Sequence, residues 1–403
     1  MKLPSTIAEL TSGFENFVLK CLPGIAASET NLLDDVFQND STPVVLYGFG
    51  NVGRRLLAGL RKVGINPVCI IDNSFSDKNT TIYGIPCVGS TEGCQRFGDQ
   101  AVFVVSLFNQ SGFNAYASIR GTLERLGAKR VRYFMPVMWR YASELLPYYC
   151  FDLPSKIMNH QSELIRVYYA LADEESRACF AFHLYQLVCP DPVFTVEATL
   201  QAETYFPPGI VSLGRQEVFL DGGAFDGVTL SRFIERCEGE CSAYIGIEPD
   251  PESYAKLKDR VESLRSILAN DFVFRSCALG GSRGSVTFGA VGTISSAADA
   301  SLVGGLEVEV LTLPDVVGDF KPSLIKLDIE GAELETLQGG VELLQRSRSS
   351  LAVCVYHRQD HLWSIPLFVL TNLPGFSIFL RRHREYLDDF VMYAIPPERL
   401  QPL

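Results

Sequence analysis

The feature that most constrains the fold of this chain is an apolar run that ends in a glycine-rich loop. Residues Val218–Leu230 have the sequence Val-Phe-Leu-Asp-Gly-Gly-Ala-Phe-Asp-Gly-Val-Thr-Leu. The apolar run is typical of a buried strand, and the glycines let the backbone approach a ligand closely. The N–H groups that open the following helix attract an anionic group. The segment therefore predicts a strand, loop and helix that bind a nucleotide-type cofactor.

Three later apolar runs also predict strands, and two of them are followed directly by an acidic residue. Ala243–Ile247 is followed by Glu248, and Phe272–Gly280 is a strand that leads into a turn. Leu324–Leu327 is followed by the carboxylate of Asp328. In open α/β sheets ligands bind at the carboxyl ends of the strands, where an acid such as Glu248 accepts hydrogen bonds from ribose hydroxyls. These strand ends predict an adenosyl cofactor.

Three motifs carry a more specific pattern: Phe219–Gly227, Ile247–Asp250 (Ile-Glu-Pro-Asp) and Lys326–Glu333 (Lys-Leu-Asp-Ile-Glu-Gly-Ala-Glu). They resemble the motifs of the FkbM family of S-adenosylmethionine-dependent methyltransferases, and the resemblance covers roughly residues 205 to 398. It implies a class I methyltransferase fold and, as a rule, O-methylation of a sugar or another hydroxyl acceptor. Four C-terminal segments are similar to one branch of the family, namely Val355–Arg358, Asp360–Trp363, Leu380–His383 and Val391–Pro396.

The resemblance and the strand ends together predict the residues that hold S-adenosyl-L-methionine. Glu248 would bind the ribose, and the turn of Cys277 and Ala278 would line the adenine. The methionine part would lie on the loop formed by Asp221, Gly222, Gly223, Ala224, Phe225, Asp226 and Gly227.

The catalytic candidates are Asp328, Glu330 and Lys326, with Asp328 as the leading one. The three lie on one face if the strand continues, because strand side chains alternate. Asp328 or Glu330 would orient or deprotonate a hydroxyl, or hold a divalent ion that acidifies it. For Glu330 and Glu333 the alternative is a favourable interaction with the N-terminus of the next helix. For Glu333 we expect only this structural role.

His357 follows the apolar run Leu351–Tyr356 and is the histidine best placed to act as a general base, because its pKa is naturally near neutrality. Alternatively, it hydrogen-bonds within the turn and positions only the backbone. His357 and His361 are four residues apart and could share a helix face as metal ligands, but no third ligand is evident nearby. The sequence therefore predicts no metal site at this histidine pair and leaves the use of a divalent ion at Asp328 or Glu330 open.

A second glycine fingerprint lies in the first half of the chain. Gly48, Gly50 and Gly53 have the full G-x-G-x-x-G spacing after an apolar strand, and Val68–Asp72 supplies a second strand that ends in the acidic Asp72. This pattern predicts a Rossmann-like unit whose ligand would be NAD or a nucleotide-sugar. Alternatively, the glycines only permit close packing of helix on strand, and Asp72 caps the turn at Asn73 and Ser74. The sequence does not choose between these interpretations.

The length of 403 residues suits two domains. We expect an α/β fold with two doubly wound Rossmann-like domains, joined by bridging helices. The aromatic residues of these helices suit packing in the core or between the domains; alternatively, they form an acceptor-binding wall or a homodimer face. The predicted bounds are an N-terminal helical segment at 1–42, a Rossmann-like nucleotide-binding domain at 43–140, bridging helices at 141–206 and a class I methyltransferase domain at 207–403.

Composition limits the partners. No apolar run approaches the roughly 18 residues of a membrane span, and eleven irregularly spaced cysteines suit reduced thiols, so we expect a cytoplasmic protein. Residues 1–145 carry 14 basic and 12 acidic side chains, whereas the rest carries 21 basic and 35 acidic ones. The expected catalytic domain would therefore repel nucleic acid.

The predicted function is methyl transfer from S-adenosylmethionine to an oxygen of a carbohydrate or related small-molecule or glycan acceptor. The alternative is a dinucleotide-dependent oxidoreductase or a nucleotide-sugar-binding module that acts through the first domain. No Tyr-x-x-x-Lys pair follows the Gly48 loop, which disfavours the oxidoreductase.

Overall fold

The computed structural model describes residues 4, 6–37, 42–72, 80–107, 112–191, 200–265, 271–288, 306–384 and 387–400. The chain forms two compact units. The first unit contains residues 1–165, 178–199 and 384–388, and the second contains residues 166–177, 200–383 and 389–403. Residues 141–206, which we expected to form a separate bridging segment, are thus divided between the two units.

The first unit begins with short helical segments, α1 (Ile7–Ser12), α2 (Phe14–Asn16), the π-helical turn η1 (Phe17–Cys21) and α3 (Leu22–Ser28). The Thr6 side chain caps α1 by accepting a hydrogen bond from the backbone N–H of Glu9. The later helices of this unit are α4 (Asn51–Lys62), α5 (Ser90–Phe97), α6 (Gly112–Arg125), α7 (Phe134–Arg140), α8 (Ala142–Leu145) and α9 (Pro154–Met158). Two further helices, α10 (Gln161–Ala170) and α11 (Glu174–Val188), are each divided between the two units.

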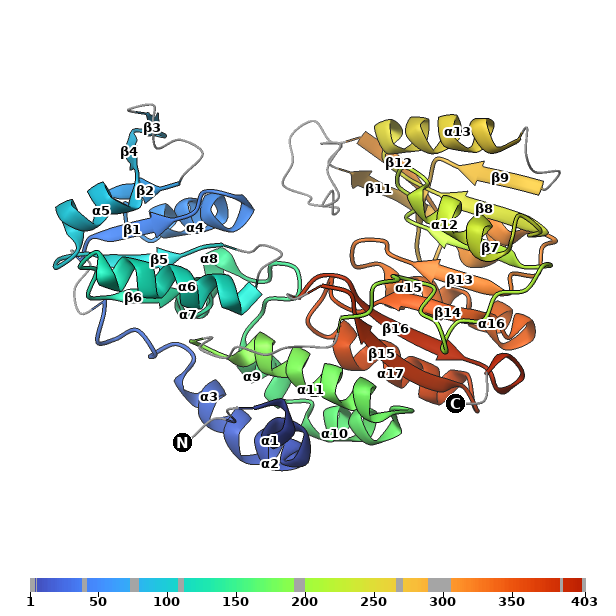
Figure 1. Ribbon diagram of the computed structural model, residues 1–403, viewed down its shortest axis with the longest axis horizontal. Coiled ribbons are helices and arrows are strands. Elements are labelled where there is room, and N and C mark those ends of the chain that lie inside the picture. Colours follow the sequence, from blue (N-terminus) through green and yellow to red (C-terminus); the bar gives the residue numbers. More distant parts are fainter. Residues whose placement is uncertain are drawn as a thin grey trace. The chain divides into compact units, whose positions relative to one another are not determined.

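The sheet of the first unit has the strand order β3-β4-β2-β1-β5-β6 (Figure 1). Its strands are β1 (Val44–Tyr47), β2 (Cys69–Ile71), β3 (Thr81–Ile82), β4 (Ile85–Val88), β5 (Val102–Val105) and β6 (Val131–Tyr133). All neighbours pair in parallel except β3 and β4. From β4 to β6 the order is that of a doubly wound sheet. The central β1 and β5 are apolar and buried, as parallel strands covered on both faces must be.

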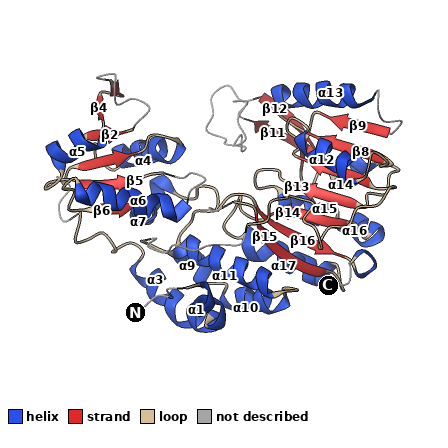
Figure 2. Cartoon of the chain, in the orientation of Figure 1, coloured by secondary structure: helices blue, strands red, loops and turns tan. Residues whose placement is uncertain are grey.

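The second unit contains a seven-stranded sheet with the order β15-β16-β14-β13-β7-β8-β9 (Figure 2). Its strands are β7 (Val218–Gly222), β8 (Ala243–Ile247), β9 (Asp271–Arg275), β13 (Leu324–Leu327), β14 (Ser350–Cys354), β15 (Ser377–Arg382) and β16 (Phe390–Ile395). The five strands from β9 to β14 pair in parallel, and β16 is antiparallel to both of its neighbours. The carboxyl ends of β8, β7 and β13 therefore meet at one edge of the sheet.

Helices and a small sheet complete the second unit. The helices are α12 (Val228–Arg236), α13 (Pro251–Arg265), α14 (Leu313–Val317), α15 (Glu333–Gly339), α16 (Val341–Ser347), α17 (His361–Asn372) and the 3₁₀ turn η2 (Pro397–Arg399). The small sheet has the order β10-β12-β11, formed by β10 (Ala278–Leu279), β11 (Gly284–Phe288) and β12 (Leu306–Leu311). It follows β9 in the chain and supplies apolar residues to the site described below.

Candidate functional site

A cavity of about 520 Å³ lies at the carboxyl ends of the central strands of the second unit. This volume is within the range of small-molecule sites. The walls come from the loops after β7 and β8, from the small sheet and from the turn after β13. The lining residues are Gly223, Phe225, Ile247, Glu248, Pro249, Asp250, Ser253, Cys277, Ala278, Leu279, Gly280, Val286, Val310, Asp328, Ile329, Glu330, Gly331, Ala332, Glu335 and Arg358.

The predicted cofactor residues divide into two groups. Gly223, Phe225, Glu248, Cys277 and Ala278 line the cavity. The remaining predicted residues belong to the loop but do not line the cavity. Asp226 precedes α12, and its carboxylate accepts a hydrogen bond from Val228 N at 3.1 Å. Asp221, Gly222, Ala224 and Gly227 are likewise outside the cavity wall.

The loop after β7 is held tightly between its two neighbouring strands. The N–H groups of Gly223 and Ala224 both donate to Ile247 O at 2.9 Å. Gly223 has φ +74°, and a Cβ atom on it would lie 1.9 Å from the carbonyl oxygen of Asp328. The fold therefore requires glycine at this position, both for its left-handed backbone and for the close approach of β13.

We expect Gly223→Ala to be more destabilising than an alanine at another left-handed glycine. Gly209 has φ +80°, and apart from its chain neighbours the described residues place no atom within 4 Å of its Cβ position, so Gly209→Ala is the matched control. The control carries only the left-handed penalty of about 1–2 kcal/mol. The clash at Gly223 adds about 1–3 kcal/mol to the loss in free energy of unfolding. Urea unfolding of both variants measures the difference, and equal losses would contradict the close contact.

A buried ion pair supports the loop. Asp221 on β7 and Lys326 on β13 are opposite one another in the register, with Lys326 Nζ 3.0 Å from Asp221 Oδ1. Lys326 Nζ also donates to Gly223 O at 2.6 Å, and Tyr244 OH donates to Asp221 at 3.0 Å. Both charged side chains are almost fully buried and lie outside the cavity wall. Lys326, expected as a catalytic candidate, therefore positions the glycine loop.

Glu248 joins two loops of the cavity wall. One of its carboxylate oxygens accepts a hydrogen bond from Phe225 N and the other from Asp250 N, both at 2.8 Å. Burial raises the pKa of Glu248, and these backbone donors oppose the rise. Each oxygen retains a further lone pair, so the carboxylate can still accept hydrogen bonds from a ribose.

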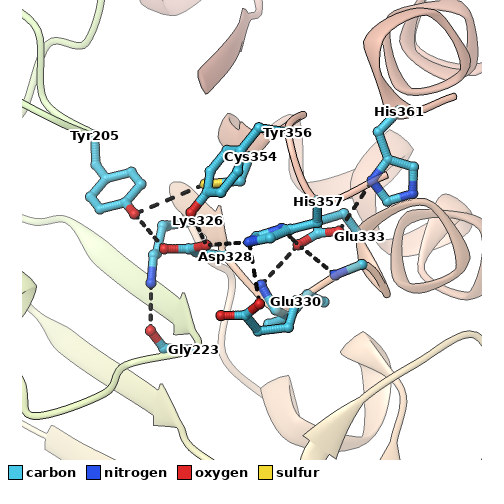
Figure 3. A network of polar contacts seen from close by, with 12 residues as sticks. Tyr205, Gly223, Lys326, Asp328, Glu330, Glu333, Cys354, Tyr356, His357 and His361 are labelled. Carbon is cyan, nitrogen blue, oxygen red and sulfur yellow. Dashed lines mark hydrogen bonds and ion pairs between the residues drawn. The ribbon is translucent and has the colours of Figure 1, made fainter. Parts of the chain in front are cut away.

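Asp328 lies in the cavity wall, where two tyrosine hydroxyls and a histidine surround its carboxylate (Figure 3). Tyr205 OH donates to it at 2.7 Å and Tyr356 OH at 3.3 Å, while His357 Nε2 lies 3.4 Å away. Burial alone would raise its pKa, but the charges of Lys326 and His357 lower the pKa below the usual value. Asp328 is therefore held as an anion with a fixed orientation.

Glu330 differs from Asp328 in both backbone and surroundings. Strand β13 ends at Leu327, and Glu330 has φ +56°, so the expected strand continuation is wrong and alternation does not place this residue. Its carboxylate accepts no hydrogen bond from the described part of the chain, and His357 Nε2 lies 3.8 Å away. Burial raises the pKa of Glu330 to about 7. A cavity-lining carboxylate with free lone pairs and this pKa suits a general base.

His357 lies between Glu333 and the two cavity carboxylates (Figure 3). Its Nδ1 atom is 2.7 Å from Glu333 Oε1. Burial opposes the charged imidazole, but Glu333, with Asp328 and Glu330, raises the pKa of His357 to about 9. A histidine that is already protonated at neutral pH cannot accept a proton, so the geometry disfavours the general-base role that we expected for it.

The glycine loop of the first unit is explained partly by packing. Gly48 has φ +91°, and a Cβ atom on Gly53 would lie 2.4 Å from Gly48 O. Asp72 accepts a hydrogen bond from Phe49 N at 2.8 Å, so it ties the loop to the end of β2. Gly50 differs, because beyond its chain neighbours no atom of the described residues lies within 4 Å of its Cβ position. The turn at residues 73 and 74, which Asp72 was expected to cap, lies outside the described residues.

The described residues contain neither a metal-binding cluster nor a membrane-spanning helix. No group of three or more His, Cys, Asp or Glu side chains that could hold a metal ion is found there. Within the same residues, no helix has both the length and the apolar composition needed to span a bilayer.

Part of the second unit is similar to a known protein family. Residues 221–386 match the family model described as Methyltransferase FkbM domain. The crystal structure of Methyltransferase FkbM from Methylobacillus flagellatus KT is similar, with a TM-score of 0.76 and 19% identity over 94% of this chain and 100% of that chain. At this identity the likeness shows the fold, and the predicted α/β methyltransferase fold is confirmed.

More distant structures also match part of the chain. Precorrin-6y C5,15-methyltransferase from Geobacter metallireducens GS-15 has a TM-score of 0.29 and 10% identity over 46% of this chain and 83% of that chain. Fibrillarin from Aeropyrum pernix, solved with S-adenosyl-L-methionine, has a TM-score of 0.28 and 13% identity over 46% of this chain and 70% of that chain. No curated protein matches the chain.

Proposed function

We propose that this chain, whose residues 221–386 match the Methyltransferase FkbM domain model, transfers the methyl group of S-adenosylmethionine to a hydroxyl oxygen of a carbohydrate or related metabolite. The observation that carries the proposal is the placement of Asp328 and Glu330 in the wall of the cavity that also contains the glycine loop. This arrangement puts proton-accepting groups beside the predicted cofactor site.

The chemistry of the cavity wall fits S-adenosylmethionine. Apolar side chains such as Ile247, Leu279 and Val310 suit the adenine, and Glu248 suits the ribose. Among the described residues, the charged groups of the wall are Glu248, Asp250, Asp328, Glu330, Glu335 and Arg358. Five carboxylates against one guanidinium attract a sulfonium cation and disfavour the pyrophosphate of a dinucleotide.

The cofactor, when bound, supplies an activated methyl group, so the protein must align the acceptor oxygen and remove its proton. In our proposal the acceptor hydroxyl donates its hydrogen bond to Glu330, which takes the proton as the methyl group is transferred. Asp328, fixed by Tyr205 and Tyr356, accepts a hydrogen bond from a second hydroxyl of the acceptor and so orients it. Acceptors with neighbouring hydroxyls, as in sugars, satisfy both carboxylates.

Transfer from cofactor with an isotopically labelled methyl group to a panel of sugars and nucleotide-sugars tests the reaction. The expected product is a labelled methyl ether, detected by its methyl resonance and by mass. Labelled methyl groups found only on nitrogen or carbon atoms of the acceptors would contradict O-methylation.

Replacing Glu248 tests the cofactor site. We expect Glu248→Ala to weaken binding of S-adenosylhomocysteine by about 1–3 kcal/mol, since it removes a ribose acceptor and frees the N–H groups of Phe225 and Asp250. The control is Glu252→Ala, which removes the same charge from an exposed position on α13. Calorimetric titration measures both affinities, and an unchanged affinity in Glu248→Ala would remove Glu248 from the site.

A second candidate function uses the first unit, which would bind NAD or a nucleotide-sugar at its glycine loop. The open space around Gly50 favours this candidate, because packing does not explain a glycine there. Calorimetry with NAD and with nucleotide-sugars tests it. Binding that is lost in Gly50→Val would support the candidate, whereas binding that survives in this variant would place the ligand elsewhere.

A further inference from the structure

We propose that Glu333, the first residue of α15, is a positioning residue for the methyl transfer proposed above, because it holds His357 with Nε2–H directed at Asp328 and Glu330. The inference rests on the proposed function for its catalytic meaning. The arrangement of the three side chains can be tested without turnover.

Glu333 is fully buried and makes more contacts than a helix terminus requires. Its Oε1 atom accepts hydrogen bonds from Ile329 N at 2.9 Å and from Gly331 N at 3.4 Å, and lies 2.7 Å from His357 Nδ1. Its Oε2 atom lies 3.3 Å from His361 Nδ1 on α17. A carboxylate that only favours the helix N-terminus can remain exposed, so the expected structural role does not account for this burial.

These contacts fix the turn that carries Glu330. The N–H groups of Ile329 and Gly331 flank Glu330, which has the strained φ of +56°. A non-glycine residue persists in this conformation only when its surroundings enforce it. Glu333 thus supports both the backbone of Glu330 and the imidazole that faces the Glu330 carboxylate.

The contact with Glu333 also decides which way His357 donates. A carboxylate accepts only, so Nδ1 carries a proton, and Nε2 is left facing Asp328 at 3.4 Å and Glu330 at 3.8 Å. Nε2 is buried, and none of the described residues forms a hydrogen bond with it. The pKa of His357, raised to about 9, leaves the ring doubly protonated at neutral pH, so Nε2 carries a proton as well. An acceptor oxygen that enters between the two carboxylates would meet this Nε2–H group.

The charges around His357 come from several elements. Asp328 and Glu330 face it from the turn after β13, Glu333 faces it from α15, and His361 approaches from α17 through the other oxygen of Glu333. The ring of Tyr356 lies 4.1 Å from the imidazole between centroids. The neighbouring guanidinium of Arg358 instead pairs with Glu335 and Asp360. His357 is therefore surrounded mainly by negative charge.

A change at Glu333 should be transmitted to Glu330. Burial raises the pKa of Glu330, and the charged His357 opposes that rise more strongly than Glu333 adds to it. If Glu333 loses its charge, His357 becomes neutral near pH 7 and no longer opposes the rise, so the pKa of Glu330 increases. Because the base must be ionised, the rise of kcat/KM with pH then moves to higher pH.

The variant Glu333→Gln tests this coupling, because the glutamine oxygen can still accept from Ile329 N, Gly331 N and His357. We expect the rising limb of the pH profile of kcat/KM to move up by about one pH unit. The control Glu342→Gln removes an equal charge from an exposed position on α16 and should leave the limb in place. An unchanged limb in Glu333→Gln would overturn the proposal.

Nitrogen NMR of the histidine rings of the full chain gives an answer that does not depend on turnover. The signal of His357 is assigned by its loss in His357→Gln. We expect a doubly protonated ring at pH 7.5 in the original protein and a neutral ring in Glu333→Gln. A neutral His357 ring in the original protein would overturn the proposal even if methyl transfer is found. A charged ring together with no methyl transfer to any acceptor would count against the proposed function alone.

Discussion

Glu330→Gln lowers kcat by about 10²- to 10⁴-fold, because the amide cannot take the proton of the acceptor hydroxyl. The affinity for S-adenosylhomocysteine changes little, since Glu330 accepts no hydrogen bond from the described part of the chain and the amide has nearly the same shape. Steady-state kinetics and calorimetry on the same preparation measure the two effects. Glu342→Gln, on the exposed side of α16, is the control.

The pH profile separates the roles of the two cavity carboxylates. Burial raises the pKa of Glu330 to about 7. Because Glu330 must be ionised to accept a proton, activity should rise with pH through neutrality. Glu330→Gln removes this rise. In the original protein the pKa of Asp328 is depressed, so this carboxylate stays ionised throughout this range and does not cause the rise. Asp328→Asn therefore lowers the rate but retains the rise of activity with pH. Full activity of Glu330→Gln, or loss of the rise in Asp328→Asn alone, would assign the base to Asp328.

Lys326→Met lowers the free energy of unfolding by about 3–5 kcal/mol, because it leaves Asp221 buried without its counter-charge. Methionine has a volume similar to that of lysine, so packing changes little. The loss of stability therefore arises mainly from the missing charge and from the Gly223 carbonyl, which loses its hydrogen bond from Lys326 Nζ. Urea unfolding measures the change. Lys256→Met is the control, because the pair of Lys256 with Glu252 is exposed and should contribute less than about 1 kcal/mol.

A second substitution tests the reason for this loss. In Asp221→Asn with Lys326→Met neither charge remains, so the double variant should recover a large part of the lost stability. Equal instability of the single and double variants would mean that the contact of Lys326 with Gly223 O outweighs the ion pair.

The parts of the site that depend on local pattern could be predicted from the sequence. A glycine loop after an apolar strand and acids after parallel strands need only the chain order, since parallel strands bring their carboxyl ends together. Gly223, Glu248, Ala278 and Asp328 accordingly line one cavity.

The orientation of charged side chains could not be predicted in the same way. The alternation of side chains along a strand predicts that Lys326 and Asp328 point to the same side of the sheet. It does not predict that the ammonium group of Lys326 is buried in an ion pair with Asp221 on the neighbouring strand. The turn at Glu330 depends on φ +105° at Gly331 and on the buried carboxylate of Glu333, which only the folded chain supplies.

The sequence gives little indication of the two tyrosines that hydrogen-bond to Asp328. Tyr205 is 123 residues away in the chain and has φ +71°. Its backbone N–H donates to the hydroxyl of Tyr393 on β16, and this contact holds the segment that brings the phenol to Asp328. Tyr356 lies beside His357 in the sequence, and its position next to a catalytic candidate was the one available indication.

The most direct test of the central claim is calorimetric titration of the intact protein with S-adenosylhomocysteine, compared with Ala278→Phe and Gly50→Val. Ala278 lines the cavity of the second unit, so phenylalanine should fill it, whereas valine at Gly50 alters only the loop of the first unit. We expect one site per chain, lost in Ala278→Phe and retained in Gly50→Val. Folded protein that binds no S-adenosylhomocysteine, or binding lost only in Gly50→Val, would contradict the proposed cofactor site.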